Sequence, residues 1–287
     1  MAMQFPADAI AHIQSYGVPT QVRQTSQKRS ILLVPTCQLA FHFIALPRNP
    51  FVDAQAFQQL TEAFNQQNIQ LIHLWEDVWL HKKDIVHSRI SSLLGKSQKV
   101  YARKTRVQRI DQVLLHQFLE ANHLEGATKA KFKYGLFEGN QLLAVASFAA
   151  MRTMNQKGAN YRSGELIRFC NKSGMTVVGG FSKLLHAFIQ DRHPNDIMTY
   201  VNRDWANGNS YLKLGFKLES LTPPLPLWLH PKEGKRYLEA KLLKKLNHQP
   251  DPHQTIPEFL HSKGFINVYT SGNLKLRKAL SPQVQSH

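Results

Sequence analysis

Two adjacent glycines, Gly179 and Gly180, stand directly before residues 184–189, whose apolar side chains recur at helical spacing. A glycine has no side chain, so the backbone N–H groups of such a turn can approach a phosphate closely, and the N-terminus of the following helix favours its charge. We therefore expect a phosphate-binding loop, with Lys183 and Arg168 adding positive charge. The candidate ligand contacts are Arg168, Val177, Val178, Gly179, Gly180, Phe181, Ser182 and Lys183, with Ser182 either capping the helix or bonding the ligand.

Short apolar runs on either side of this loop predict buried strands at residues 166–169 and 197–201. Ligands of open α/β sheets lie at the carboxyl ends of strands, so the loop after the second strand should border the same site. Its candidate catalytic residues are Asn202, which can orient a nucleophile but cannot take its proton, and Asp204, which can. Beyond it, Tyr211 is a candidate acid or a packing partner of Phe216.

With the segment Tyr211-Leu-Lys-Leu-Gly-Phe216, these motifs resemble the core of a GNAT-type acyltransferase, and more closely its Mom-like DNA-modification branch. In that branch, phage-type proteins carry an N-terminal Vsr-like (Hef-like) homing endonuclease. The resemblance, which covers most of the chain, implies an α/β fold with a mixed sheet and an acyl-CoA or related acyl donor. It also implies transfer to a nucleobase amine, with the exocyclic amine of adenine as the expected acceptor. The relatives usually have aspartate where Asn202 stands, which weakens the expectation of catalysis.

The N-terminal half has the element order of a Vsr-like, restriction-endonuclease-like fold. Strands are predicted at residues 30–35, 38–45 and 69–75, and helices at 54–67 and 83–94. The resemblance places the family's metal-binding and catalytic side chains at Ile31, His42, Phe57 and Leu60. A nuclease of this type needs oxygen ligands for a divalent cation, and these side chains do not supply them. We therefore expect no metal site and no nuclease activity, but a pseudonuclease that keeps a DNA-docking surface.

The chain is strongly basic, with a formal net charge of +17 from 36 Lys+Arg against 19 Asp+Glu. Such an excess indicates a polyanionic partner, with DNA the expected one. Basic residues concentrate between positions 82 and 109, where they can contact phosphates without reading sequence; a solvated helix face followed by a linker is the alternative. The predicted nucleic-acid contacts are Lys82, Lys83, Arg89, Lys96, Lys99, Arg103, Lys104 and Arg106.

The expected location is the cytoplasm. No apolar run approaches the ~20 residues of a membrane-spanning helix, and the N-terminus lacks the features of a signal peptide. Cys37 and Cys170 are expected to be buried free thiols.

Few large apolar residues occur in residues 96–109, which we take as a domain boundary. The expected domains are a nuclease-fold module at 1–100, a GNAT-like module at 101–250 and a C-terminal part at 251–287. That last part should contain a strand at 264–276 and a disordered tail at 281–287. The leading interpretation is a DNA-directed acyltransferase. The alternatives are a non-catalytic DNA-binding remnant of a homing endonuclease, or an acyltransferase acting on RNA or on a protein amine.

Overall fold

The computed structural model describes residues 5–24, 30–46, 54–158, 160–247, 250–251 and 253–280. The chain folds into two compact units. Unit 1 comprises Met1–Lys83, Asn202–Asn207 and Thr222–Asn273, and unit 2 comprises Asp84–Val201, Gly208–Leu221 and Leu274–His287. The units therefore interleave along the chain, which differs from the expected blocks 1–100, 101–250 and 251–287. The stretch expected to be a linker, residues 96–109, forms strands within unit 2.

Unit 1 contains a sheet with strand order β1-β2-β3-β4, in which the β3–β4 pair is parallel and the other pairs are antiparallel. The strands and helices expected for this half are confirmed. Their bounds are α1 (Ala7–Gln14), β1 (Gln21–Gln24), β2 (Ser30–Val34), η1 (Pro35–Cys37), β3 (Leu39–Ile44), α2 (Ala54–Asn65), β4 (Gln70–Trp75) and α3 (Glu76–His81). The nearly continuous apolar character of β2, β3 and β4 matches their burial.

A second, smaller sheet of unit 1 has strand order β15-β14-β16 and packs against two helices around Trp228 and Phe265. These elements are β14 (Pro226–His230), β15 (Lys235–Tyr237), α8 (Glu239–Leu246), α9 (Ile256–Ser262) and β16 (Ile266–Tyr269). The Arg236 guanidinium on β15 donates to both carboxylate oxygens of the buried Asp77, at 2.8 and 2.7 Å. This bidentate pair ties β15 to α3, so Asp77 has a structural role.

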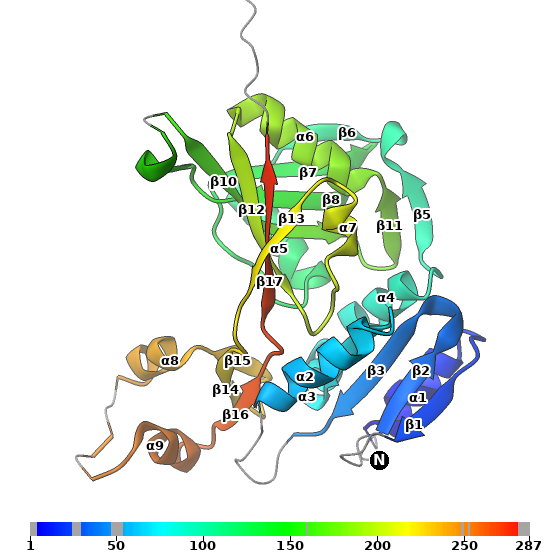
Figure 1. The fold of residues 1–287 in the computed structure, drawn as a ribbon, viewed down its shortest axis with the longest axis vertical. Helices are drawn as coiled ribbons and strands as arrows, with labels where there is room; N and C mark the ends of the chain where they lie inside the picture. The colour runs from blue at the N-terminus through cyan, green and yellow to red at the C-terminus, as the bar shows by residue number, and fades with distance from the viewer. Residues whose placement is uncertain are drawn as a thin grey trace, which may run out of the picture. The chain divides into compact units, whose positions relative to one another are not determined.

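Unit 2 is built on a mixed sheet with strand order β13-β17-β12-β10-β8-β7-β6, which Figure 1 shows with β17 between β12 and β13. The elements are α4 (Lys83–Leu93), β5 (Gln98–Tyr101), η2 (Ala102–Lys104), β6 (Arg106–Arg109), α5 (Gln112–Asn122), β7 (Phe132–Glu138), β8 (Gln141–Phe148), β9 (Arg152–Thr153), η3 (Asn155–Lys157), β10 (Arg162–Asn171), β11 (Met175–Val178), α6 (Gly180–Arg192), β12 (Asp196–Asn202), α7 (Asn209–Leu212), β13 (Lys217–Leu221) and β17 (Asn273–Ala279). The predicted helix at 83–94 is confirmed as α4.

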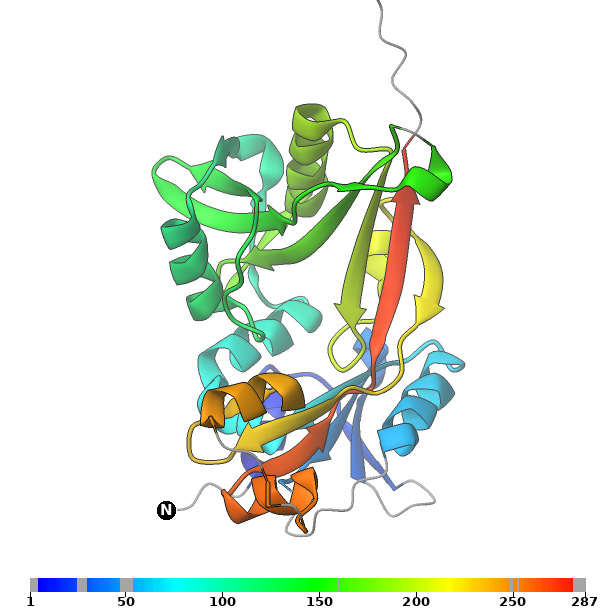
Figure 2. The same ribbon diagram turned by 90° about the vertical axis from the view of Figure 1, so that its left-hand side faces the viewer.

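Helices cover both faces of this sheet. On one face, α5 packs around Val145 of β8 together with Cys170. On the other face, Phe188 of α6 stacks on Phe148 of β8, with ring centroids 3.8 Å apart. Val145 and Phe148 are an odd number of residues apart on one strand, so their side chains point to opposite faces. Figure 2 shows α5 and α6 in this arrangement.

Both cysteines are free thiols, as expected. Cys170 is buried beneath α5, whereas Cys37 is only partly buried at the end of η1, so the expectation of burial is wrong for Cys37.

The strand expected at residues 264–276 is instead two strands in two different sheets. β16 belongs to the small sheet of unit 1 and β17 to the large sheet of unit 2. The break falls at Gly272, whose φ of +84° is strained for other residues. The tail at 281–287 lies outside the described residues. In the part of the chain that is described, no helix is long and apolar enough to cross a membrane.

Candidate functional site

The sheet of unit 2 splits between β10 and β12. These parallel strands pair from Ser163 opposite Asp196 as far as Leu166 opposite Thr199, and their pairing ends there although both strands continue. On its other edge β10 remains paired with β8, with a register shift at Ile167. Such a bulge bends a strand and redirects its side chains. Along one edge of the second half of β10, the backbone groups therefore pair with no strand among the described residues.

The chain beyond β10 forms β11 and enters α6 through the two glycines. Gly179 precedes α6 with φ +79° and ψ −1°, a left-handed conformation that glycine adopts without penalty. No side chain caps the helix, so Ser182, which is exposed in its first turn, does not have the expected capping role. The first N–H groups of a helix have no partner within the helix and lie at its positive end. The start of α6 is therefore suited to a phosphate.

The second glycine serves packing. Gly180 is buried, and a Cβ there would lie 2.9 Å from both Cβ and Cγ1 of Val177. Lys183, expected to contact the ligand, instead turns to the 3-10 helix η2: its Nζ donates to the carbonyl oxygen of Ala102 at 2.8 Å and to that of Thr105. The assignment of Lys183 as a phosphate contact is therefore corrected. Its charge is held by backbone oxygens about 80 residues earlier in the chain, which no local pattern relates to it.

Tyr211 of α7 belongs to a series of packed aromatic rings. Phe169, in the split half of β10, stacks on Phe181 at 4.7 Å, and Phe181 meets Tyr211 edge-on at 4.9 Å. Tyr211 also contacts Phe216 at 5.7 Å, as expected from its spacing. Burial raises the pKa of Tyr211 to about 12, against the opposing effect of Arg89. The phenol is thus protonated at neutral pH, and it can donate a proton or a hydrogen bond.

Charged side chains surround this phenol within unit 2. Arg168 of β10 donates to Glu125 at 2.8 Å, so its guanidinium already has an anionic partner. Arg89 of α4 interacts electrostatically with Cys170, Tyr211 and Glu125, and desolvation lowers its pKa although part of the residue is exposed. Arg89, which was expected to contact DNA, is exposed and interacts electrostatically with Tyr211. Glu125 was not anticipated, because nothing local in the sequence relates it to Arg168.

The other expected catalytic residues lie in the segment Asn202–Asn207, which belongs to unit 1. Asp204 is buried, and its Oδ1 accepts from both the backbone N–H and the hydroxyl of Ser271, each at 2.7 Å. Asn202 Oδ1 accepts from the backbone N–H of Asp204 at 2.9 Å. These bonds give both side chains structural roles. The expectation that Asp204 replaces a catalytic base is not supported by its geometry, because the carboxylate is committed to Ser271.

The basic residues expected to bind nucleic acid are not equivalent. Lys83 forms an ion pair with Asp8 at 3.1 Å within unit 1, which leaves it less suited to a phosphate. Arg106 donates to the carbonyl oxygen of Gly139 at 2.9 Å but remains exposed. The exposed members in unit 2 are Arg89, Lys96, Lys99, Arg103, Lys104 and Arg106, and Lys82 is partly buried in unit 1.

The positions aligned with a nuclease centre form part of the core of unit 1. Ile31 lies opposite His42, and Ile31 and Leu60 pack in one apolar cluster. His42 Nδ1 lies 3.0 Å from Nδ1 of His73, and Phe57 packs against both rings. Among the described residues, no group of three or more His, Cys, Asp or Glu side chains could hold a metal ion.

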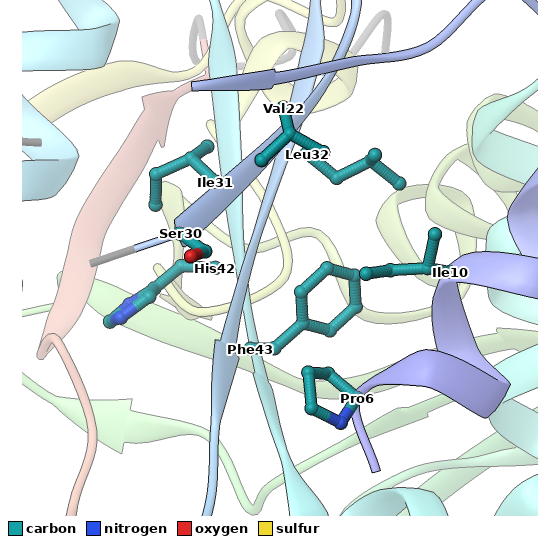
Figure 3. A pocket seen from close by; sticks show the side chains of 8 residues that line it. All are labelled: Pro6, Ile10, Val22, Ser30, Ile31, Leu32, His42 and Phe43. Atoms are coloured by element: carbon teal, nitrogen blue, oxygen red, sulfur yellow. The ribbon is translucent and has the colours of Figure 1, made fainter. Parts of the chain in front are cut away.

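The two histidines belong to a directional chain of hydrogen bonds. The Thr61 hydroxyl donates to the carbonyl oxygen of Phe57 at 2.9 Å, so it accepts from His73 Nε2 at 2.7 Å. His73 then carries its proton on Nε2, and its Nδ1 accepts from His42. A cavity of about 290 Å³ lies on the opposite side of β2 and β3, where Figure 3 shows Pro6, Ile10, Leu32 and Phe43 gathered. Its lining is mostly apolar and includes two polar residues, Ser30 and His42.

Solved acetyltransferase structures resemble this chain. An acetyltransferase of Bacillus subtilis in complex with CoA is 14% identical, with 62% of this chain and 99% of that chain covered and a TM-score of 0.36. The IAA acetyltransferase of Bacillus cereus is 12% identical, with 61% and 99% covered and a TM-score of 0.37. The ribosomal-protein-S18-alanine N-acetyltransferase of Escherichia coli is 10% identical, with 64% and 98% covered and a TM-score of 0.36. Likenesses at these scores show nothing about activity.

No protein-family model matches the chain, and no curated protein matches it. The functional assignment therefore rests on the split strands, the start of α6 and the surroundings of Tyr211.

Proposed function

We propose that unit 2 is a GNAT-like acyltransferase that uses an acyl-CoA or related donor. The observation that carries this proposal is the separation of β10 from β12 beyond Leu166, directly before a loop that opens α6. An extended donor arm can add hydrogen bonds to the free edge of a strand, in the manner of an added β-strand. Its phosphates would meet the N–H groups of Gly180, Phe181 and Ser182.

Transfer to an amine requires a proton to reach the leaving sulfur. The donor supplies an activated thioester: the amine nitrogen attacks the carbonyl carbon, the C–S bond breaks, and one proton passes from nitrogen to sulfur. Tyr211 is protonated and lies beside Phe181, at the start of α6. We assign it the role of giving a proton to sulfur, with its own proton restored from the amine through solvent. No carboxylate is assigned as base, because Asp204 is bonded to Ser271.

The proposed acceptor is an amine of a DNA base. The support is the charge of +17 and the resemblance of the motifs to the Mom-like branch. In the same proposal unit 1 is a Vsr-like pseudonuclease that docks on DNA, consistent with Ile31 and Phe57 lying in its core. Reaction at a base amine requires the base to leave the stack, at a cost of a few kcal/mol.

Two measurements test the proposal in sequence. Acetyl-CoA should raise the melting temperature of the full-length protein, since a ligand that binds only the folded state stabilises it. Mass spectrometry of nucleosides from DNA of cells expressing the protein should then detect an acylated base. Stabilisation by acetyl-CoA without a modified nucleoside would indicate RNA or protein amines as the acceptor instead.

The bonding of Asp204 favours one alternative, a non-catalytic DNA-binding remnant of a homing endonuclease. A chain that lacks a base and has lost its nuclease residues would still bind DNA through its basic surface. DNA binding without any thermal response to acyl-CoA would support this alternative.

A further inference from the structure

An exposed apolar pair lies beside the loop that opens α6. Tyr101 and Val178 are partners in the parallel pairing of β5 with β11, and they are 49% and 41% exposed. The preceding pair in the same register, Val100 and Val177, is buried. The two strands therefore present one apolar face to the interior and a second one, at Tyr101 and Val178, to solvent.

Positive charge accompanies this pair. The Arg103 guanidinium lies 5.3 Å from the centre of the Tyr101 ring, a cation–π contact. Lys99 precedes Tyr101 by two residues on β5, so its side chain leaves the same face of the strand, and it is exposed. An aromatic ring, an aliphatic side chain and two cations thus form one exposed corner.

The corner is fixed against the candidate phosphate loop. Val178 is followed directly by Gly179, and a Cβ at Gly179 would lie 3.6 Å from Cβ of Ala102. Lys183 of α6 holds η2 through the carbonyl oxygens of Ala102 and Thr105. Arg103 lies between these two anchored residues, so the corner keeps its place at the N-terminus of α6.

We propose that Lys99, Tyr101, Arg103 and Val178 bind the adenosine 3′-phosphate end of the CoA-type donor. This inference rests on the proposed function and deepens it. A purine has a flat apolar face that can stack on Tyr101 and Val178, and its 3′-phosphate dianion complements Arg103 and Lys99. The donor's pyrophosphate would lie next to this corner, at the first turn of α6. Lys99 and Arg103 are thereby moved from a DNA-contacting surface to a nucleotide site.

The test compares CoA, 3′-dephospho-CoA and adenosine 3′,5′-bisphosphate in calorimetric titrations of the full-length protein. Tyr101→Ala should weaken binding of all three by about tenfold, because one stacking contact is lost. Arg103→Met should weaken CoA and the bisphosphate by about tenfold, the scale of one charged hydrogen bond, and leave 3′-dephospho-CoA within about twofold of the native protein. Matched controls are Val113→Ala, whose side chain is 64% exposed on α5, and Lys129→Met, an exposed cation in a loop. Both should leave all three affinities unchanged.

The outcomes distinguish failure of the corner from failure of the proposed function. If the native protein binds none of the three ligands, the proposed function fails and the corner loses its ligand with it. If the native protein binds CoA but Tyr101→Ala and Arg103→Met bind it equally well, only the corner assignment fails. If those variants keep CoA but lose duplex DNA, the corner belongs to nucleic acid. Melting curves of each variant exclude unfolding as the cause of any loss.

Discussion

At the scale of single residues, Tyr211 has a phenol that stays protonated and a ring that is packed among other side chains. Burial raises its pKa to about 12, and Arg89 and Arg168 oppose the effect of burial while Glu125 adds to it. A phenol in this state does not ionise between pH 6 and 9, so it can act as an acid but not as a base. The positive charges nearby stabilise the phenolate that forms once the proton has left.

Tyr211→Phe should therefore lower the turnover of acyl transfer by about 100-fold, the lower end of a general acid's contribution. The affinity for acetyl-CoA should stay within a few-fold, since the ring and its packing on Phe181 are kept. Release of free thiol from acetyl-CoA, measured across pH 6 to 9, gives the rate. Because the folded pKa lies well above this window, Tyr211 should introduce no alkaline decline in the native protein. Equal turnover of variant and native protein would remove Tyr211 from the reaction.

The pair His42 and His73 is a second case in which a residue's role depends on its partners. Replacing His73 with leucine removes the hydrogen bonds that the buried Nδ1–H of His42 donates to it and that the Thr61 hydroxyl accepts from it, at a cost of about 1–3 kcal/mol in unfolding free energy. The double variant His42→Leu with His73→Leu should cost less than the sum of the single changes, because both polar partners are removed together. Urea denaturation of the four proteins measures this coupling, and additive costs would argue against the hydrogen-bond chain.

At the scale of elements, the turn from β11 into α6 uses its two glycines for different reasons. Gly179 is exposed and needs its left-handed backbone, whereas Gly180 is buried and needs the absence of a side chain. The adjacent glycines predict the turn from sequence. Which of them is needed for its backbone conformation and which for packing depends on Val177 and on η2.

Gly180→Ala should lower the unfolding free energy by about 1–3 kcal/mol, because its Cβ would collide with the branched Cβ of Val177. Gly179→Ala should cost about 1 kcal/mol, the strain of a left-handed alanine, since its Cβ meets only Ala102 at 3.6 Å. Chemical denaturation of both variants checks the order. A larger loss for Gly179→Ala would mean that backbone strain outweighs packing at this turn.

Asp196 joins distant elements of unit 2 through one buried carboxylate. It accepts from Tyr161 at 2.8 Å, from Arg277 of β17 at 2.6 Å, from Lys157 at 3.2 Å and from Ser163 of β10. Burial alone would raise the pKa of Asp196, but these hydrogen bonds outweigh it and hold the pKa below its usual value.

Asp196→Asn should destabilise the protein by about 2 kcal/mol or more near neutral pH, because two cations lose a buried partner. A carboxyl with a lowered folded-state pKa contributes stability above its unfolded pKa of about 3.9, and the contribution is lost as pH falls through the lower folded value. The difference in unfolding free energy between the native protein and the variant should therefore become smaller below pH 4. Denaturation at pH 3 and pH 7 tests this, with the exposed Asp84→Asn as a control.

At the scale of the whole molecule, the charge of +17 is distributed over both units, and part of it is committed to ion pairs. The residues retained as duplex contacts are the exposed Lys96, Lys104 and Arg106 of unit 2. Phosphate contacts release counterions, so the affinity for DNA should fall steeply with salt.

Changing Lys96, Lys104 and Arg106 together to glutamine should weaken binding of any duplex sequence. It should also make the dependence of log K on log salt shallower by about 0.9 for each contact removed. Fluorescence anisotropy at salt concentrations from about 50 to about 200 mM gives both the affinity for the duplex and its dependence on salt. Over this range of about fourfold, the strength of phosphate contacts changes greatly. Lys213→Gln, another exposed cation of unit 2, is the control. An unchanged salt slope would exclude these residues from the interface.

Features that depend on neighbouring residues could be predicted from the sequence. The helix at 54–65, the helix at 83–93, the strand run 70–75 and the glycine turn into α6 all follow from apolar periodicity or from glycine's conformational freedom. The contact of Tyr211 with Phe216 is of the same kind, because four intervening residues complete a helical turn and a glycine closes it.

The partners of the polar side chains on these elements depend instead on the packing of the folded chain. Lys183 reaches η2, Arg89 reaches the surroundings of Tyr211, and Asp204 reaches Ser271. Each partner lies dozens of residues away along the chain, and the choice depends on which loops the packed sheets bring together. The assignment of β16 and β17 to separate sheets has the same cause. Local pattern predicts that a segment is extended, while its strand partners are selected by burial of the whole unit.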